Sequence, residues 1–178
     1  MTHMSTGFKN SHQDQLLHGV AYVAFQELAT RVAHRNTGHL SNDEVCDLLM
    51  QRIALDENLH MLFYRNVLSG ALDLAPDQAM GAIVDVLTHF EMPGASIEGF
   101  GRKSIQMALA GVYDARQHLD DVIQPILRQW NIFERNDFGP AGEAKREELA
   151  VFLADLETQA SKFEQMRDAR RARAAAKQ

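Results

Sequence analysis

Residues 53–60 read Ile-Ala-Leu-Asp-Glu-Asn-Leu-His, which places an acid and an imidazole three residues apart inside an otherwise apolar helix. On a helical period, Glu57 and His60 share one stripe with four other residues: Leu49, Ile53, Tyr64 and Val67. Because most of that stripe is apolar, we expect it to face a core. A buried carboxylate and imidazole cost free energy unless something compensates them, and a metal ion is the usual compensator.

The preceding stretch carries a second isolated acid. Glu27 shares a helical stripe with five other residues: Leu16, Val20, Val23, Thr30 and His34. A short turn joins the two predicted helices, so they should pack antiparallel. Helical side chains lean toward their own N-terminus, which brings Glu27 and Glu57 to about the same level. We therefore expect Glu27, Glu57 and His60 to be metal ligands. The alternatives are that Glu57 and His60 hydrogen-bond to other buried groups, or that their stripe faces solvent.

The rest of the chain predicts an all-α protein without strand-like alternation. Gly38 is expected to end the first helix as a left-handed residue, and Ser41 with Glu44 to cap the second. Asp114 and His118 are interpreted as a helix start and an ordinary surface pair, and Trp130 as a packing residue at a helix end. We expect helices over residues 14–35, 41–70, 76–90, 102–110, 114–130 and from 140 into the tail.

Composition sets limits on organisation and on partners. The 178 residues suffice for one domain, which we divide into a loose N-terminus at 1–13, a helical domain at 14–166 and a basic tail at 167–178, helical or frayed. A net charge of −6 argues against nucleic acid as the main partner. No apolar run is long enough to cross a bilayer, and the first residues lack the features of a secretory signal. Cys46 is the only cysteine, so a cytoplasmic location is predicted.

A Glu on one helix and Glu-x-x-His on its neighbour form half of the ligand set of the ferritin-like di-iron carboxylate bundles. The whole set is a Glu from each of two helices and Glu-x-x-His from each of two others. Carboxylates suit iron, and a bridging carboxylate can hold two ions close together. The pattern therefore predicts a ferritin-like helical bundle with half of a di-iron site.

Several short segments carry a family resemblance. Residues 25–30 (Phe-Gln-Glu-Leu-Ala-Thr), 34–38 (His-Arg-Asn-Thr-Gly) and 53–60 resemble the soluble acyl-acyl-carrier-protein desaturases, especially the actinobacterial type. The likeness continues through 89–93, 111–114 and 132–133, and covers nearly all of residues 16–163.

The resemblance implies a di-iron enzyme that inserts a cis double bond into an acyl chain held as a thioester on acyl carrier protein. Such an enzyme uses O₂ and two electrons from a ferredoxin-type donor. Glu27, Glu57 and His60 match family iron ligands, and Thr30 matches a threonine beside the oxygen-binding side of the cluster. His34 falls in a family motif, where we expect it to support the ligands or to pack.

The chain departs from the family pattern in one respect. Family members carry two earlier helices with another Glu and a Glu-Glu-x-x-His segment, which this sequence does not contain. It therefore resembles the C-terminal half of a desaturase. Three interpretations follow: a truncated or split-gene product that needs the missing half and exposes a broad apolar face alone, a homodimer that rebuilds a four-Glu, two-His site, or a catalytically inactive helical interaction subunit. We favour the first. The double-bond position, acyl chain length and electron donor do not follow from the sequence.

Overall fold

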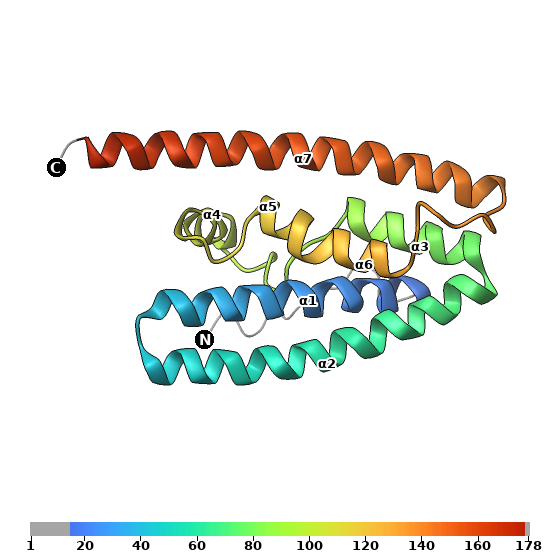
Figure 1. Cartoon of the computed structure of the whole chain (residues 1–178), viewed down its shortest axis with the longest axis horizontal. Coiled ribbons are helices and arrows are strands. Elements are labelled where there is room, and N and C mark those ends of the chain that lie inside the picture. The colour runs from blue at the N-terminus through green and yellow to red at the C-terminus, as the bar shows by residue number, and fades with distance from the viewer. Residues whose placement is uncertain (1–14, 177–178) are drawn as a thin grey trace.

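A computed structural model describes residues 15–176, and these residues form helices joined by turns and loops, with no strand. The first two helices, α1 (Leu16–Ser41) and α2 (Glu44–Leu74), form an antiparallel hairpin (Figure 1). The remaining elements follow in chain order: α3 (Pro76–Thr88), α4 (Phe100–Ala110), α5 (Ala115–Gln117), the π-helix η2 (His118–Ile123), α6 (Gln124–Gln129) and α7 (Pro140–Ala175). The all-α architecture predicted from the sequence is confirmed.

The elements stack in three layers. The α1–α2 hairpin forms one side, with α1 between α2 and the middle layer; α3 and the α5–η2–α6 segment form that middle layer, and the long α7 lies along the opposite side (Figure 1). The buried core lies where α1 and α2 meet the middle layer. Phe25 in α1 packs edge-on against Trp130, with ring centroids 5.7 Å apart. The indole Nε1 of Trp130 donates a hydrogen bond to the backbone carbonyl of Arg65 in α2, so the packing role expected for Trp130 is confirmed.

Within residues 15–176, none of the helices combines the length and the apolar character needed to span a lipid bilayer.

The end of the first helix differs from the prediction. Helix α1 continues through Gly38 to Ser41, and the left-handed residue is Asn42, with φ of 52°. Gly38 serves a different purpose, because a Cβ built there would lie 2.6 Å from the Asp47 side chain and 3.0 Å from the Met50 Cβ. The glycine therefore permits the close approach of α1 and α2, and Asn42 adopts the left-handed conformation with modest strain.

The start and end of α2 also correct the sequence interpretation. Asp43 caps the helix by accepting a hydrogen bond of 2.7 Å from the Cys46 amide, whereas Ser41 donates to the Gly38 carbonyl. The expected Ser41–Glu44 capping box is therefore wrong. The helix also continues past Gly70 to Leu74. Burial of Leu72 against the core outweighs the modest cost of one glycine inside a helix.

The later boundaries are close to those predicted. Helix α3 begins at Pro76 as expected but ends at Thr88, and α4 begins at Phe100. Asp114 caps α5 in a capping box with Gln117, but the expected single helix 114–130 is interrupted by the π-helix η2. Helix α7 begins at Pro140 and continues into the basic tail as far as Ala175. The loose segment predicted at 1–13 lies outside the described residues.

Candidate metal centre

Glu27 from α1 and Glu57 and His60 from α2 converge. Each of the three side chains offers one possible ligand atom, and these atoms all lie within 4.8 Å of one another. The His60 Nδ1 atom lies 3.3 Å from Glu27 Oε2 and 3.8 Å from Glu57 Oε2. Within residues 15–176, Glu27, Glu57 and His60 are the one group of three or more acidic, histidine or cysteine side chains that lie close enough together to hold a metal ion.

Helix geometry explains this convergence. Glu57 and His60 are one turn apart on α2 and therefore point to the same side. The turn at Asn42–Asp43 reverses the chain, so α1 runs antiparallel beside them. Glu27 lies 15 residues before Asn42 and Glu57 lies 14 residues after Asp43, so the two residues stand at nearly the same level of the hairpin. The three side chains lie together in the structure, as the sequence predicts.

The electrostatics of the group favour a bound cation. The pKa of Glu27 is raised to about 7, first because burial disfavours its charged form and then because Glu57 lies beside it, while His60 acts in the opposite direction. Two carboxylates held together in a partly buried place repel each other when both are charged. A metal ion between them would remove that repulsion, and two carboxylates with one imidazole suit iron. The three residues thus fit part of an iron site.

His34 and Thr30 lie next to the group. The His34 Nδ1 atom is 3.8 Å from Glu57 Oε1, whereas His60 Nδ1 is 3.8 Å from the other oxygen of that carboxylate, Oε2. The Thr30 hydroxyl is within donating distance of two backbone carbonyls, those of Gln26 at 3.1 Å and Glu27 at 3.0 Å. Both residues follow Glu27 along the same side of α1, so they border the candidate centre.

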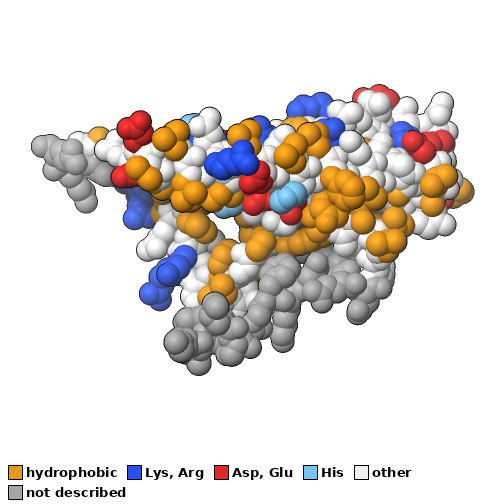
Figure 2. Space-filling model, turned by 90° about the horizontal axis from the view of Figure 1, so that it is seen from below, with side chains coloured by type: hydrophobic (Ala, Val, Ile, Leu, Met, Phe, Trp, Pro, Cys, Tyr) orange, Lys and Arg blue, Asp and Glu red, His pale blue; other side chains and the backbone are white. Residues whose placement is uncertain are grey.

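Solvent exposure of the centre differs from the sequence expectation. The side chains of Glu27 and Glu57 are largely buried, but that of His60 is 59% exposed. Leu49 and Val67, from the same stripe as His60, are also exposed. The prediction that this stripe faces a core holds only in part, because Ile53 and Tyr64 are half-buried, and Tyr64 packs against the core. Figure 2 views this side of the molecule, where hydrophobic side chains flank a histidine and acidic groups. We call this surface the open face; its exposed apolar residues in α2 include Leu49, Leu55, Leu59, Phe63 and Val67.

The interpretation of Asp114 and His118 as a surface pair is also wrong. Asp114 is buried and accepts a hydrogen bond of 2.8 Å from Arg167 in α7. The His118 ring stacks on Phe90 with centroids 4.7 Å apart, and its Nδ1 is 2.8 Å from the Tyr113 hydroxyl. Neither residue belongs to the convergent group of Glu27, Glu57 and His60. The partner of Asp114 is 53 residues away in sequence, so short-range spacing carried no signal of this burial.

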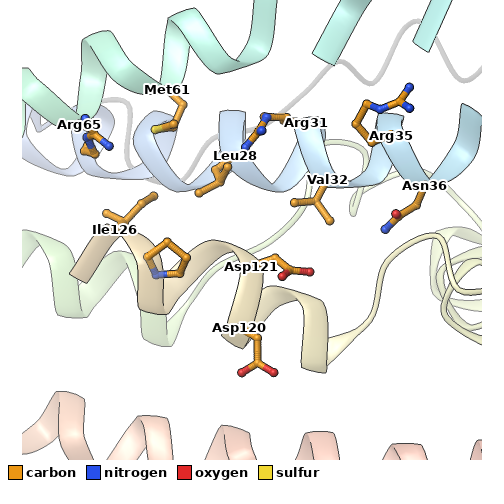
Figure 3. A pocket seen from close by; sticks show the side chains of 11 residues that line it. Leu28, Arg31, Val32, Arg35, Asn36, Met61, Arg65, Asp120, Asp121 and Ile126 are labelled. Carbon is orange, nitrogen blue, oxygen red and sulfur yellow. The ribbon is translucent and has the colours of Figure 1, made fainter. Parts of the chain in front are cut away.

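A pocket of about 440 Å³ lies between α1 and the η2–α6 segment (Figure 3). No sequence pattern indicated it, because its walls come from three separate stretches of the chain. Leu28, Val32 and Ile126 supply apolar lining, and the rim combines two kinds of charge. The charged lining residues are Arg31, Arg35, Arg65, Asp120 and Asp121.

Comparisons with known proteins agree with this architecture. A family model described as fatty acid desaturase matches residues 1–178. The DesA1 acyl-[acyl-carrier-protein] desaturase of Mycobacterium tuberculosis is 52% identical over 151 residues, which are 85% of this chain and 45% of DesA1. The chloroplastic stearoyl-[acyl-carrier-protein] 9-desaturase 1 of rice is 31% identical over 138 residues, which are 72% of this chain and 36% of the rice protein.

The crystal structure of the acyl-ACP desaturase DesA2 from Mycobacterium tuberculosis is similar in fold. It superposes with a TM-score of 0.63 at 25% sequence identity, over 74% of this chain and 52% of DesA2. The chain spans less than half of the length of both curated relatives. The sequence-based expectation of a partial, ferritin-like helical bundle is thus confirmed, and this chain belongs to the fatty acid desaturase family.

Proposed function

We propose that this chain is the C-terminal part of an acyl-[acyl-carrier-protein] desaturase, and that Glu27, Glu57 and His60 are half of its di-iron ligand set. The convergence of these three side chains within 4.8 Å carries the proposal. The names of the mycobacterial and rice relatives support the substrate class, a fatty acyl chain on acyl carrier protein. The free cysteine, Cys46, fits the cytoplasmic location that we propose for the complex.

The reaction removes one hydrogen from each of two adjacent carbons and forms a cis double bond between them. Reduction of one O₂ to two waters consumes those two hydrogens, two protons and two electrons from an external donor, which we propose to be of the ferredoxin type. A bound pair of iron ions would supply the oxidising chemistry. The protein must position the acyl chain and deliver protons.

The chain's own residues divide these tasks in our proposal. Glu27, Glu57 and His60 would hold the metal, and His34 lies beside Glu57, where it would help to position that carboxylate. Thr30 borders the site, and we propose its hydroxyl oxygen as the group that would hold a proton at this side of the site. Its two contacts to backbone carbonyls hold that oxygen in place beside Glu27.

The pocket between α1 and η2–α6 fits the proposed substrate. Its apolar lining suits an aliphatic chain or the arm that carries it. Arg31 and Arg65 at its rim would attract an acidic carrier protein, although Asp120 and Asp121 offset part of that charge. The attraction would be local, because the whole chain carries a net charge of −6.

Reconstitution tests the proposal. The chain is mixed with a polypeptide corresponding to the part of Mycobacterium tuberculosis DesA1 that it does not match, loaded with ferrous iron without oxygen, and supplied with stearoyl carrier protein, a ferredoxin, its reductase and O₂. We expect a product lighter by two hydrogens, and loss of that product with Glu57→Ala. Asp56→Ala is the matched control, because Asp56 is the exposed neighbouring acid. An oxygenated product would instead indicate a hydroxylase, and iron binding without any turnover an inactive helical subunit.

A further inference from the structure

A second pocket lies on the α7 side of the middle layer. It has a volume of about 350 Å³, and its walls come from the end of α3 and the residues after it, from the segment that leads through α5 into η2, and from α7 (Figure 1). Phe90, Met92, Phe152 and Leu156 make much of the wall apolar. None of the described residues that line it belongs to the candidate metal centre or to the pocket between α1 and η2–α6. The pocket is therefore separate from the proposed desaturase site.

Two polar side chains form a hydrogen-bonded pair in this apolar wall. The Tyr113 hydroxyl lies 2.8 Å from Nδ1 of His118, and the His118 ring stacks on Phe90. Within residues 15–176, neither the hydroxyl nor the other ring nitrogen, Nε2, has a second hydrogen-bond partner from the protein. Burial raises the pKa of Tyr113 and lowers that of His118 to about 4, so both groups are neutral at neutral pH.

The chemistry of the pair fixes what it can bind. A neutral imidazole has one N–H donor and one acceptor nitrogen. If the Tyr113 hydroxyl donates to Nδ1, then Nε2 can donate to a ligand and the Tyr113 oxygen can accept. If Nδ1 donates instead, the Tyr113 hydroxyl can donate to a ligand and Nε2 can accept. In both arrangements the pair offers one donor and one acceptor, which a ligand hydroxyl group complements.

The charge of the wall disfavours an anion such as a free fatty acid. None of the described lining residues is a lysine or an arginine, and Asp114 contributes a carboxylate. Arg167 already pairs with that carboxylate at 2.8 Å, so Asp114 does not need a cation from a ligand. An ionised ligand placed here would lose its hydration without gaining an opposite charge, whereas a neutral hydroxyl group would not meet that cost.

The volume suits a small molecule with a hydrocarbon part. An apolar cavity of about 150 Å³ can hold benzene, and this pocket has more than twice that volume. We propose that the pocket binds a neutral alcohol, with its hydroxyl group at the Tyr113–His118 pair and its hydrocarbon part against Met92, Phe152 and Leu156. This inference does not depend on the di-iron function proposed above.

The test is a titration of the full chain with n-hexanol, followed by NMR of methyl-labelled methionine. Met92 lines this pocket and Met61 lines the pocket between α1 and η2–α6, so their signals distinguish the two sites. Met92→Leu identifies the Met92 signal by removing it. We expect hexanol to shift the Met92 signal to saturation and to leave Met61 unchanged. Sodium hexanoate should bind at least about tenfold more weakly, because its charge would be desolvated.

Two variants separate hydrogen bonding from apolar partitioning. Tyr113→Phe and His118→Phe each keep an aromatic ring in the wall and remove a polar atom of the pair. Each should weaken hexanol binding by about fivefold, as for the loss of one hydrogen bond. Tyr64→Phe is the matched control, because Tyr64 packs against the core but does not line the pocket, and its hexanol affinity should equal that of the original chain. Far-UV circular dichroism checks that all three variants keep their helices.

Three results would overturn the proposed alcohol site. The first is a Met92 signal that does not move in water saturated with hexanol. The second is hexanol affinity that neither Tyr113→Phe nor His118→Phe lowers, which would show that the pocket only takes up apolar molecules. The third is equal affinity for hexanol and hexanoate.

Discussion

The α1–α2 hairpin has two faces: a covered face, which packs against the middle layer, and the open face. They differ in the burial of their apolar side chains and in the partners of their charged groups. On the covered face, Phe25 is fully buried against Trp130. On the open face, Phe63 of the same hairpin is 62% exposed. Polar groups differ in the same way. Asp114, on the covered side of the molecule, is buried and forms an ion pair with Arg167. Glu27, at the open face, lies beside the carboxylate of Glu57, and its pKa is raised.

The covered face therefore contains residues that stabilise the fold of this chain. The open face contains residues that we expect to contact a metal ion or another polypeptide. The middle layer and α7 satisfy the covered face with groups from within the chain. The open face combines apolar exposure with three convergent metal-ligand side chains. Substitutions on the covered face should therefore lower the free energy of unfolding strongly and affect metal binding little. Substitutions of the ligand group at the open face should do the opposite.

The largest expected difference is between two phenylalanines. Phe25→Ala removes a fully buried ring and should lower the free energy of unfolding by about 3–5 kcal/mol. Phe63→Ala should change it by less than about 0.5 kcal/mol, as for an ordinary surface substitution. Urea denaturation of the metal-free monomer at low protein concentration measures both. Equal losses would contradict the distinction between the covered and open faces.

Two ion pairs extend the comparison to charged groups. Arg167→Ala leaves the buried carboxylate of Asp114 without its guanidinium, although backbone amides of Arg116 and Gln117 still donate to it. We expect a loss of roughly 2–4 kcal/mol, near the low end of values for a broken buried pair. Arg52→Ala, which breaks an exposed pair with Asp56, should cost less than about 0.5 kcal/mol. A comparable effect of the two substitutions in urea denaturation would show that Asp114 is better solvated than the structure indicates.

Acid should destabilise the covered side through His118. Burial lowers the pKa of His118 to about 4, from 6.5 in an unfolded chain. The unfolded chain then binds a proton that the folded chain excludes, so the free energy of unfolding falls as the pH drops below 6.5, until the pH reaches about 4. This residue alone should account for a loss of about 2 kcal/mol between pH 7 and 5.

His118→Phe keeps an aromatic ring against Phe90 but cannot be protonated. Between pH 7 and 5, the free energy of unfolding of His118→Phe should therefore fall by about 2 kcal/mol less than that of the original chain. Urea denaturation at both pH values measures the difference, and His89→Gln, at an exposed histidine, serves as the control. Parallel pH profiles of the original chain and His118→Phe would refute the role of His118.

The convergence of Glu27, Glu57 and His60 could be predicted because it depends on local rules. Helical spacing aligns Glu57 with His60, and a short turn sets the antiparallel partner. The exposure of His60 could not be predicted from the same rules. An apolar stripe indicates that a helix face is suited to packing, but not whether another element of this chain packs against it. The role of Gly38 was missed because a close helix contact and a helix end both favour glycine. The burial of Asp114 depends on α7, which is distant in sequence.

Iron content per chain after anaerobic ferrous loading tests the central claim most directly. It is measured for the original chain, Glu57→Ala and Asp56→Ala, each alone and with the DesA1-derived polypeptide. We predict that the original chain and Asp56→Ala retain equal amounts of iron in at least one of these mixtures, and that Glu57→Ala retains essentially none. Iron that persists in Glu57→Ala at the level of the original chain would contradict the assignment of these residues as metal ligands.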